Sequence, residues 1–395
     1  MSRSFILSSP LLALLLITAS GCAGDDSSTT ADTDTGTDTD TDTGDAGQLG
    51  DEASQACRDA MLAWPALLAA TDAPTVEAAY VGSAIQDYLR ASDPEGARGD
   101  DAAILAAIAD GSAPALAGVA PRARAGLAAR LRQEIAAPEM LVEDPYAAWD
   151  EGYCLWSGAL EPLAEVAALA STSDSELVNQ ISAAFTEGRA GISGQPPAAA
   201  IDDWKVPPAK QIIEKSLFTA AARVIIIEAK SAAAGDLSAA RRALELFGLV
   251  RDRLEGRNTP GIAVIEGMLS DPGATIDPAE IERQMAIAFA KRTRKYCDEA
   301  LLTGLIGAPA GYKGAVEGRT YFKLIAPDMA ARLSAEGFDA AAHAAAWDSY
   351  VDGVRSGDDI NALTDLAADL VEWNCAYQAA LGIAACTASD DQPGA

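Results

Sequence analysis

Helix start signals recur along most of the chain, and they constrain its fold more than any other feature. Asp277 is a residue type that caps helices, Pro278 fits the first helical position, and Glu280 stands at the third. Ser173, followed three residues later by a glutamate, matches a capping box. The segment 236–256 opens with aspartate and ends at glycine. Each of these three places is therefore predicted to be helical.

Strand patterns, in contrast, are scarce. The run RVIIIEA at residues 223–229 is the one short β-like stretch, and the alanine-rich sequence around it favours a buried helix instead. We therefore expect an all-α fold without a sheet, a bundle of about a dozen helices that covers residues 51–386. A stretch of this length can form one large helical domain or two fused bundles.

The two ends of the chain differ in composition from this region. Residues 1–22 combine Arg3, a short apolar run, small residues and then Cys22, which predicts a bacterial lipoprotein signal with the lipid on Cys22. The alternative is an ordinary cleaved secretory signal. Residues 23–50 hold eight aspartates and no basic residue, so we expect a disordered tether, and residues 387–395 resemble a loose tail. The predicted location is the bacterial cell envelope, at the periplasmic or outer-membrane surface.

The chain is strongly acidic, with a formal net charge of −29. The predicted signal contributes +1 and the predicted tether −8, so residues 51–395 carry −22. Nucleic-acid binding requires basic patches that face the phosphates, and this charge balance argues against it. A negative surface attracts cations instead.

One sequence pattern occurs twice. Glu151–Pro162 is EGYCLWSGALEP and Glu317–Pro327 is EGRTYFKLIAP, each with Glu-Gly, then aromatic and aliphatic residues, then proline about three helical turns later. Two further helical segments follow each copy in the same order. We interpret this as a duplicated three-helix unit that covers roughly residues 144–234 and 310–386. The alternative is that alanine-rich amphipathic helices resemble one another through composition alone.

Five cysteines lie beyond the predicted signal, and outside the cytoplasm they are expected to pair and leave at least one free. Cys375 and Cys386 are eleven residues apart, so they can pair only if the chain turns, as it can at Gly382. Cys154 and Cys297 lie in similar aromatic and acidic contexts, which favours a bond between two helices. The alternative for each cysteine is a small buried apolar side chain.

Known catalytic motifs are missing from the sequence. His343 is the single histidine, and no serine stands in a Gly-x-Ser-x-Gly turn, so Ser-His or Cys-His catalysis has little basis. The sequence also contains no P-loop, no His-Glu-x-x-His and no Glu-x-x-His. We therefore do not expect an enzyme, and hydrolysis by a pair of carboxylates is the least supported class of function.

Carboxylates placed in apolar helices are the chemistry that remains. Glu228 follows four aliphatic residues, and an isolated buried carboxylate must be protonated, paired or bound to a cation. Glu214 lies fourteen residues earlier, close to four full turns, so both acids fall on nearly one helix face. Oxygen ligands with at most one imidazole suit a hard cation such as ferric iron, manganese or calcium. The candidate metal ligands are Glu151, Glu317, Glu228, Glu214, Asp339 and His343.

Structural roles compete with metal binding at each of these candidates. Asp339 and His343 stand four residues apart and share a helix face, but a lone histidine is often a hydrogen-bonded core or surface residue. A glutamate at a helix start can serve only as a cap or favour the helix dipole. Glu228 can pair with a base such as Lys210 or Arg223. Metal ligation and ion pairing thus stay open as alternatives for these acids.

The order of several segments resembles that of a known family. EGYCLWSGALEP, ISAAFTEGRAG, IIEKSLFTAAARVIIIEA and EGRTYFKLIAP are similar to the iron-assimilating, low-iron-inducible periplasmic proteins of algae, which have bacterial lipoprotein relatives. The resemblance covers about residues 144–327. It implies a secreted protein of repeated helical segments linked to high-affinity iron uptake. It also implies that Glu151 and Glu317, with the aromatic residues Trp156 and Tyr321, belong to the family pattern.

These observations together predict a lipid-anchored, extracytoplasmic binding protein for iron or another hard cation. The protein would act in metal uptake beside a membrane permease, with a site built from helix carboxylates. The alternative is a helical structural or interaction module at the cell envelope that binds no metal. The acidic surface and the missing catalytic motifs fit both classes.

Overall fold

The computed structural model describes residues 48–140, 142–169, 176–271, 273, 275–357 and 359–387. These residues are largely helical, which confirms the prediction of an all-α multi-helix bundle. The helices up to residue 189 are α1 (Gln55–Ala69), α2 (Ala73–Tyr80), α3 (Ala84–Ser92), α4 (Asp100–Asp110), α5 (Ala113–Ala117), α6 (Val119–Ala136), α7 (Pro145–Leu155), α8 (Glu161–Leu169) and α9 (Leu177–Arg189). Those that follow are α10 (Val206–Ala233), α11 (Leu237–Phe247), α12 (Arg251–Leu254), α13 (Thr259–Ser270), α14 (Pro278–Tyr296), α15 (Glu299–Leu302), α16 (Pro309–Arg332), α17 (Ala340–Ser356) and α18 (Ile360–Ala380). Short 3-10 turns cover Ala137–Met140 and Ser334–Glu336, and one π-helical turn covers Trp156–Leu160.

Some helices begin where the sequence predicts but end earlier. Asp236 caps α11, yet this helix ends at Phe247, and the chain turns through Gly248 before the short helix α12. The predicted helix 236–256 is therefore two helices. Asp277 caps α14, with proline at the first helical position as predicted. The cap predicted at Ser173 lies outside the described residues.

A small sheet departs from the prediction of none. Strand β1 (Ile192–Ser193) pairs antiparallel with β2 (Ala200–Ile201) just after α9 ends. Gly194 follows β1 with a φ of 82°, a backbone conformation that glycine adopts without strain. Strands of two residues are too short to show an alternating pattern, so no sequence signal predicts them.

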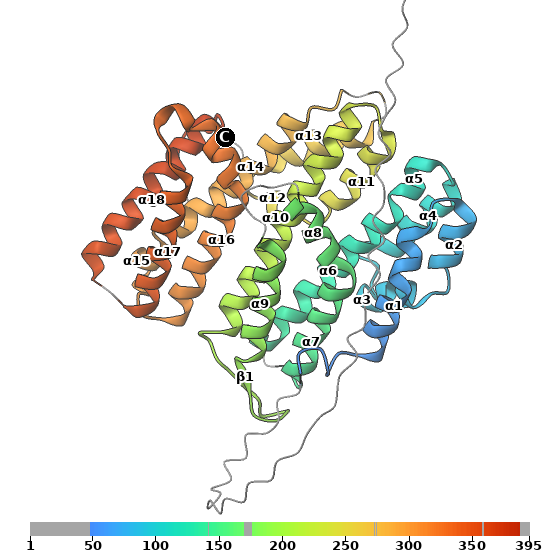
Figure 1. Cartoon of the computed structure of the whole chain (residues 1–395), viewed down its shortest axis with the longest axis horizontal. Coiled ribbons are helices and arrows are strands. Elements are labelled where there is room, and N and C mark those ends of the chain that lie inside the picture. Colours follow the sequence, from blue (N-terminus) through green and yellow to red (C-terminus); the bar gives the residue numbers. More distant parts are fainter. Residues whose placement is uncertain are drawn as a thin grey trace, which may run out of the picture. The chain divides into compact units, whose positions relative to one another are not determined.

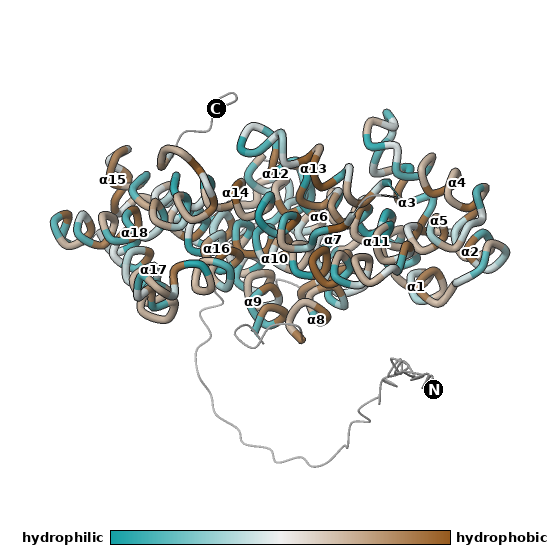
Figure 2. The backbone as a smooth tube through the Cα atoms, turned by 90° about the horizontal axis from the view of Figure 1, so that it is seen from above, coloured by the Kyte–Doolittle hydropathy of each residue, from teal (hydrophilic) through white to brown (hydrophobic). Residues whose placement is uncertain are grey.

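Helix α10 lies at the centre of the helical packing (Figure 1). It packs against α8, α9, α11, α14 and α16, and most of its residues are buried. The run RVIIIEA lies inside it, which confirms the prediction of a buried helix. Helices α15, α17 and α18 lie beyond α16, whereas α1 to α5 lie on the far side of α6 and α7. Hydrophobic and hydrophilic residues alternate along most of these helices, as expected where one face of each is buried (Figure 2).

The two Glu-Gly copies place their glycines at equivalent helix crossings. A Cβ atom on Gly152 in α7 would lie 2.8 Å from Ile135 in α6 and 3.6 Å from Phe185 in α9. A Cβ atom on Gly318 in α16 would lie 2.5 Å from the Cβ of Tyr296 in α14 and 2.7 Å from the ring of Trp347 in α17. In both copies glycine thus permits a close approach to one preceding and one following helix.

A second shared feature is a guanidinium group that lies over a tyrosine ring. Arg189 in α9 lies 4.1 Å from the ring centroid of Tyr146 in α7. Arg355 in α17 lies 5.0 Å from the ring centroid of Tyr312 in α16. Each tyrosine precedes the glutamate of its own Glu-Gly pair by five residues. These shared contacts favour a duplication, which stays an interpretation.

The described residues form one compact unit. Among the described residues, no helix combines the length and the apolar composition needed to cross a bilayer. The predicted signal with Cys22, nearly all of the predicted tether and residues 388–395 of the predicted tail lie outside the described residues.

Candidate cation site

Glu151 is a buried carboxylate in the middle of α7, with 7% of the residue exposed. The backbone N–H of Ser54 donates to its Oε2 at 2.8 Å, and the Ser54 hydroxyl donates to its Oε1 at 3.0 Å. The Tyr88 hydroxyl donates to the same Oε1 at 2.6 Å. All three donors are neutral, and no basic side chain of the described residues pairs with Glu151. Its negative charge is therefore hydrogen-bonded but carries no counter-charge.

Local sequence and one disulfide hold this carboxylate in place. Asp144 caps α7 by accepting hydrogen bonds from two backbone N–H groups, and Pro145 occupies the first helical position. Ser54 is itself the N-cap of α1, so Glu151 joins α7 to the N-terminus of that helix, where an anion is favoured. The disulfide Cys57–Cys154 fixes α1 against α7 beside it.

The Glu151 pocket, as we name the cavity that this residue lines, lies between α1, α3, α6 and α7 and has a volume of about 830 Å³. Its described lining includes one basic residue, Arg130. It also includes seven carboxylate residues: Glu52, Asp59, Asp87, Glu134, Glu143, Asp144 and Glu151. A cation that enters the pocket therefore meets a large excess of negative charge.

Two carboxylates of the Glu151 pocket affect each other. Glu134 is buried and forms an ion pair with Arg130, one helical turn earlier in α6. Burial raises the pKa of Glu134, the Arg130 charge opposes this increase, and the negative charge of Glu151 adds to it. Burial and the hydrogen bond to Glu151 together raise the pKa of Tyr88, so its phenol remains a hydrogen-bond donor. A bound cation would relieve the repulsion between Glu134 and Glu151.

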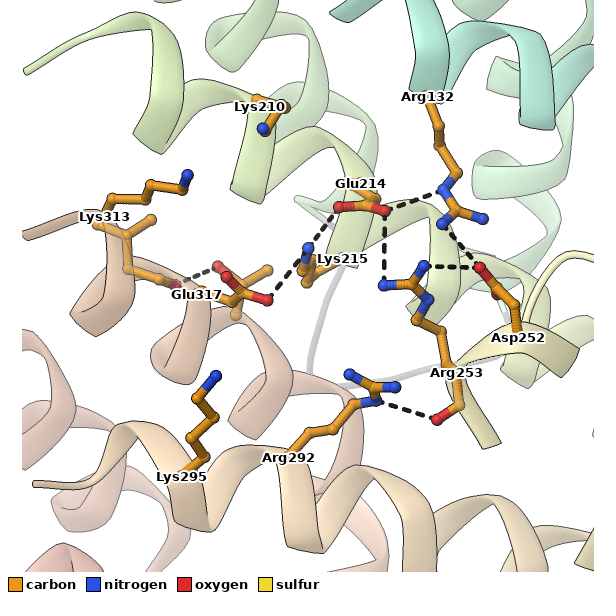
Figure 3. A network of polar contacts seen from close by, with 12 residues as sticks. Arg132, Lys210, Glu214, Lys215, Asp252, Arg253, Arg292, Lys295, Lys313 and Glu317 are labelled. Carbon is orange, nitrogen blue, oxygen red and sulfur yellow. Dashed lines mark hydrogen bonds and ion pairs between the residues drawn. The ribbon is translucent and has the colours of Figure 1, made fainter. Parts of the chain in front are cut away.

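Glu317 occupies the matching position in α16 but has an internal counter-charge. The Nζ of Lys215 in α10 lies 3.2 Å from its Oε1, and Lys215 is only 3% exposed (Figure 3). The Tyr296 hydroxyl also donates to Glu317, and burial together with this carboxylate raises the pKa of Tyr296. Both Glu151 and Glu317 lie two turns inside their helices, so the alternative that they act only as helix caps is wrong.

Glu214 lies on the other side of Lys215 in a dense network of ion pairs (Figure 3). It pairs with Lys215, and its Oε1 lies 2.9 Å from the Nε of Arg132 and 3.9 Å from Arg253. Burial alone would raise the pKa of Glu214, but Lys215 and Arg132 outweigh burial and lower that pKa to about 2. Asp252 joins the same two arginines. The charge of Glu214 is thus already neutralised by basic side chains of the protein.

Glu228 and Asp339 have structural partners of their own. The two oxygens of Glu228 accept bonds from Nε and Nη2 of Arg242 in α11, at 2.9 and 2.8 Å. The sequence left an ion pair open as one alternative for Glu228. The structure shows such a pair, but its partner is Arg242 and not Lys210 or Arg223. Asp339 caps α17, where its Oδ1 accepts hydrogen bonds from the N–H groups of Ala341 and Ala342.

His343 is buried between aromatic rings. The ring centroids of Phe322 and Phe338 lie 4.9 and 5.3 Å from its own. Its Nδ1 has no hydrogen-bond partner among the described residues and lies 4.0 Å from an oxygen of Asp369. Burial lowers the pKa of His343 to about 4 despite this neighbouring acid, so the imidazole is neutral at pH 7. The structure thus assigns His343 to the core and Asp339 to a cap.

The disulfides follow one predicted pairing and correct the other. Cys375 pairs with Cys386, and Gly382 between them has a φ of 84°, which confirms the predicted turn. The predicted bond between Cys154 and Cys297 is wrong, because Cys154 pairs with Cys57 and Cys297 is a buried free thiol. The similar local contexts of Cys154 and Cys297 carried no information on which helices meet.

Several residues around Glu151 were not found from the sequence. Ser54 and Tyr88 lie 97 and 63 residues away along the chain, and Glu134 lies in a separate helix. Their only local signal is that Ser54 fits an N-cap. Lys215 is likewise one of three lysines in the long helix α10, and its burial depends on packing against α16.

The candidate ligands do not form a single chelating group. In the part of the chain that the structure describes, no cluster of three or more histidine, cysteine, aspartate or glutamate side chains is arranged to hold a metal ion. Glu151 differs from the other candidate acids because it lines an acidic pocket without a basic partner. No protein-family model matches the chain, and comparison with curated proteins and with solved structures finds no match.

Proposed function

We propose that this protein is a lipid-anchored, extracytoplasmic binding protein for a hard cation, with iron as one cargo, and that the Glu151 pocket receives it. The observation that supports this proposal is a buried carboxylate that accepts hydrogen bonds from three neutral donors, in a pocket whose described lining holds seven carboxylates and one guanidinium. The membrane, through a lipid on Cys22, and a permease that accepts the cargo are the partners in this proposal.

The chemistry of the Glu151 pocket fits a hard cation better than a soft one. Its described polar lining consists mainly of carboxylate and hydroxyl oxygens, without histidine or a free cysteine. Oxygen donors of this kind are preferred by calcium, manganese and ferric iron. Because the carboxylates are spread around an open pocket rather than clustered, water would complete the coordination of the ion.

Terbium(III) offers a direct test, since it prefers oxygen ligands as calcium does and emits when a nearby tyrosine is excited. Tyr88 donates to Glu151 at 2.6 Å, so an ion at this carboxylate lies close to a suitable ring. Titration of the purified protein should give saturable emission on excitation of tyrosine. Ferric citrate, calcium and manganese are then added as competitors, and the strongest competitor identifies the preferred cargo.

A matched pair of variants separates this site from general surface charge. Glu151→Gln should weaken terbium binding by about tenfold or more, because two unit charges 4 Å apart interact by about 4 kcal/mol near a protein surface and about 1.4 kcal/mol is tenfold. Glu317→Gln is the control, because Lys215 already neutralises that carboxylate. Equal terbium affinity in the wild type and Glu151→Gln would exclude the pocket. A wild type without saturable binding would instead favour a helical interaction module.

The proposed anchor is tested separately from the site. Cys22→Ser should abolish lipid labelling and release the protein in soluble form, because the acylated cysteine is the proposed membrane attachment. A variant that remains bound to membranes to the same extent as the wild type would refute the anchor and leave the cation proposal untouched.

A further inference from the structure

A second cavity lies far along the fold from the Glu151 pocket, among α10, α14, α16 and α18. It has a volume of about 240 Å³ and is more enclosed than the Glu151 pocket. Its walls are mainly aliphatic, with Ala222 and Ile226 from α10, Met285 from α14, and Leu324 and Ile325 from α16. Two basic residues of α10, Arg223 and the exposed Lys230, also line it. An apolar ligand group that enters it gains by leaving water.

One carboxylate at this cavity has no direct partner. Glu282 in α14 lines it, and the structure shows no hydrogen bond or ion pair between Glu282 and any other described residue. Burial raises the pKa of Glu282, and nearby Asp328 adds to the increase, whereas the charges of Lys230 and Arg332 lower it. These charges affect Glu282 from a distance without bonding to it, so its carboxylate is free to accept a donor.

The second acid of the cavity is already satisfied. Asp328 in α16 accepts a hydrogen bond from the Tyr377 hydroxyl at 2.6 Å. It also pairs with Arg332 one turn later in the same helix, at 2.7 Å. Asp328 therefore adds negative potential to the cavity but has little need of a ligand, and Glu282 is the acid that a ligand would contact.

The volume sets the size of that ligand. An engineered apolar cavity of about 150 Å³ holds benzene, so a volume of 240 Å³ at the same filling has room for roughly ten non-hydrogen atoms. This is smaller than a drug-sized ligand and matches one ring, or a branched aliphatic group, with a short polar arm.

We propose that this cavity binds a small amine, whose apolar body fills the space between α10, α14 and α16 and whose ammonium group donates to Glu282. The apolar walls select the body of the ligand, and the unpartnered carboxylate selects the positive head group. This site is independent of the proposed cation function, because no residue lining the Glu151 pocket lines this cavity.

Isothermal titration calorimetry with 2-phenylethylamine tests the proposal, with phenylacetate as a probe of similar size and opposite charge. The wild type should bind the amine saturably and should bind the carboxylate at least about tenfold more weakly, because a hydrogen bond to a charged group is worth roughly 1.5–3 kcal/mol. Glu282→Gln should weaken amine binding by a similar factor. Ala222→Leu should reduce it as well, because the larger side chain occupies the cavity.

Two controls keep these outcomes distinct. Glu187→Gln changes an exposed glutamate of α9 and should leave amine binding unchanged. Circular dichroism confirms that each variant is folded before titration. Stronger binding of the carboxylate, unchanged amine affinity in Glu282→Gln, or no amine binding by the wild type would each overturn the proposal.

Discussion

Replacing Lys215 with methionine tests how much the buried ion pair between α10 and α16 contributes to stability. Lys215 is buried in α10, where it lies between Glu214 of the same helix and Glu317 of α16. Burial alone would lower the pKa of Lys215, but the surrounding Tyr321 and glutamates raise it, so the ammonium is charged at pH 7. Methionine is close to lysine in length but has no charge, so the change removes the cation and keeps much of the packing.

The expected loss of stability in Lys215→Met depends on which partners Glu214 and Glu317 keep. Removing one partner of a buried ion pair costs about 3–5 kcal/mol. Glu214 keeps Arg132 at 2.9 Å, so the loss falls mainly on Glu317, which is left with the Tyr296 hydroxyl. We therefore expect the lower end of that range, a decrease of about 3 kcal/mol in the free energy of unfolding.

Urea unfolding followed by circular dichroism measures this decrease, and a double variant identifies its cause. Adding Glu317→Gln to Lys215→Met removes the unpaired buried charge, so the double variant should recover more than about 1 kcal/mol relative to Lys215→Met alone. A cost below about 1 kcal/mol for Lys215→Met, or additive costs for the two changes, would refute the reasoning.

Two further predictions concern pH and packing. The folded pKa of His343, about 4, lies below its unfolded value of 6.5, so its burial contributes stability that is present above pH 6.5 and is lost as the pH falls toward 4. His343→Leu should remove up to about 3 kcal/mol of that pH dependence, which urea unfolding between pH 7 and pH 4 would reveal, and an unchanged slope would contradict it. Gly318→Ala should lower the free energy of unfolding by about 3 kcal/mol, because its Cβ would collide with the Cβ of Tyr296, which cannot move without the backbone of α14. Gly152→Ala should cost less, since its nearest contact is the Cγ2 methyl of Ile135 at 2.8 Å, against 2.5 Å for the Cβ of Tyr296 at Gly318, and equal costs in thermal melts would argue against this difference.

The sequence predicted those features that depend on neighbouring residues. Asp236 and Asp277 cap helices where the pattern indicates, because a cap is a bond between residues two or three positions apart. The internal disulfide Cys375–Cys386 was found for the same reason, since Gly382 between the two cysteines allows the turn. Helix ends were less predictable, because α11 ends at Phe247 although the helical pattern of the sequence continues to Gly256.

The environment of each candidate acid could not be predicted. Glu151 and Glu317 are each followed in sequence by a glycine and nearby aromatic residues, yet Glu151 contacts Ser54 and Glu317 contacts Lys215. These partners come from helices far along the chain, so their identity depends on tertiary packing. The pairing of Cys154 was predicted wrongly for the same reason, because its partner Cys57 lies in a helix far along the chain.

The two Glu-Gly copies share local contacts but differ in the charges around their glutamates. In both copies a tyrosine hydroxyl donates to the glutamate, and the following glycine lies at a helix crossing. In the second copy Lys215 supplies the positive charge, so Glu317 does not require a cation from solution. In the first copy no base of the described residues pairs with Glu151, and acids of neighbouring elements add to its charge. Two similar sequences therefore differ in their chemistry, and a requirement for an external cation is expected at Glu151 alone.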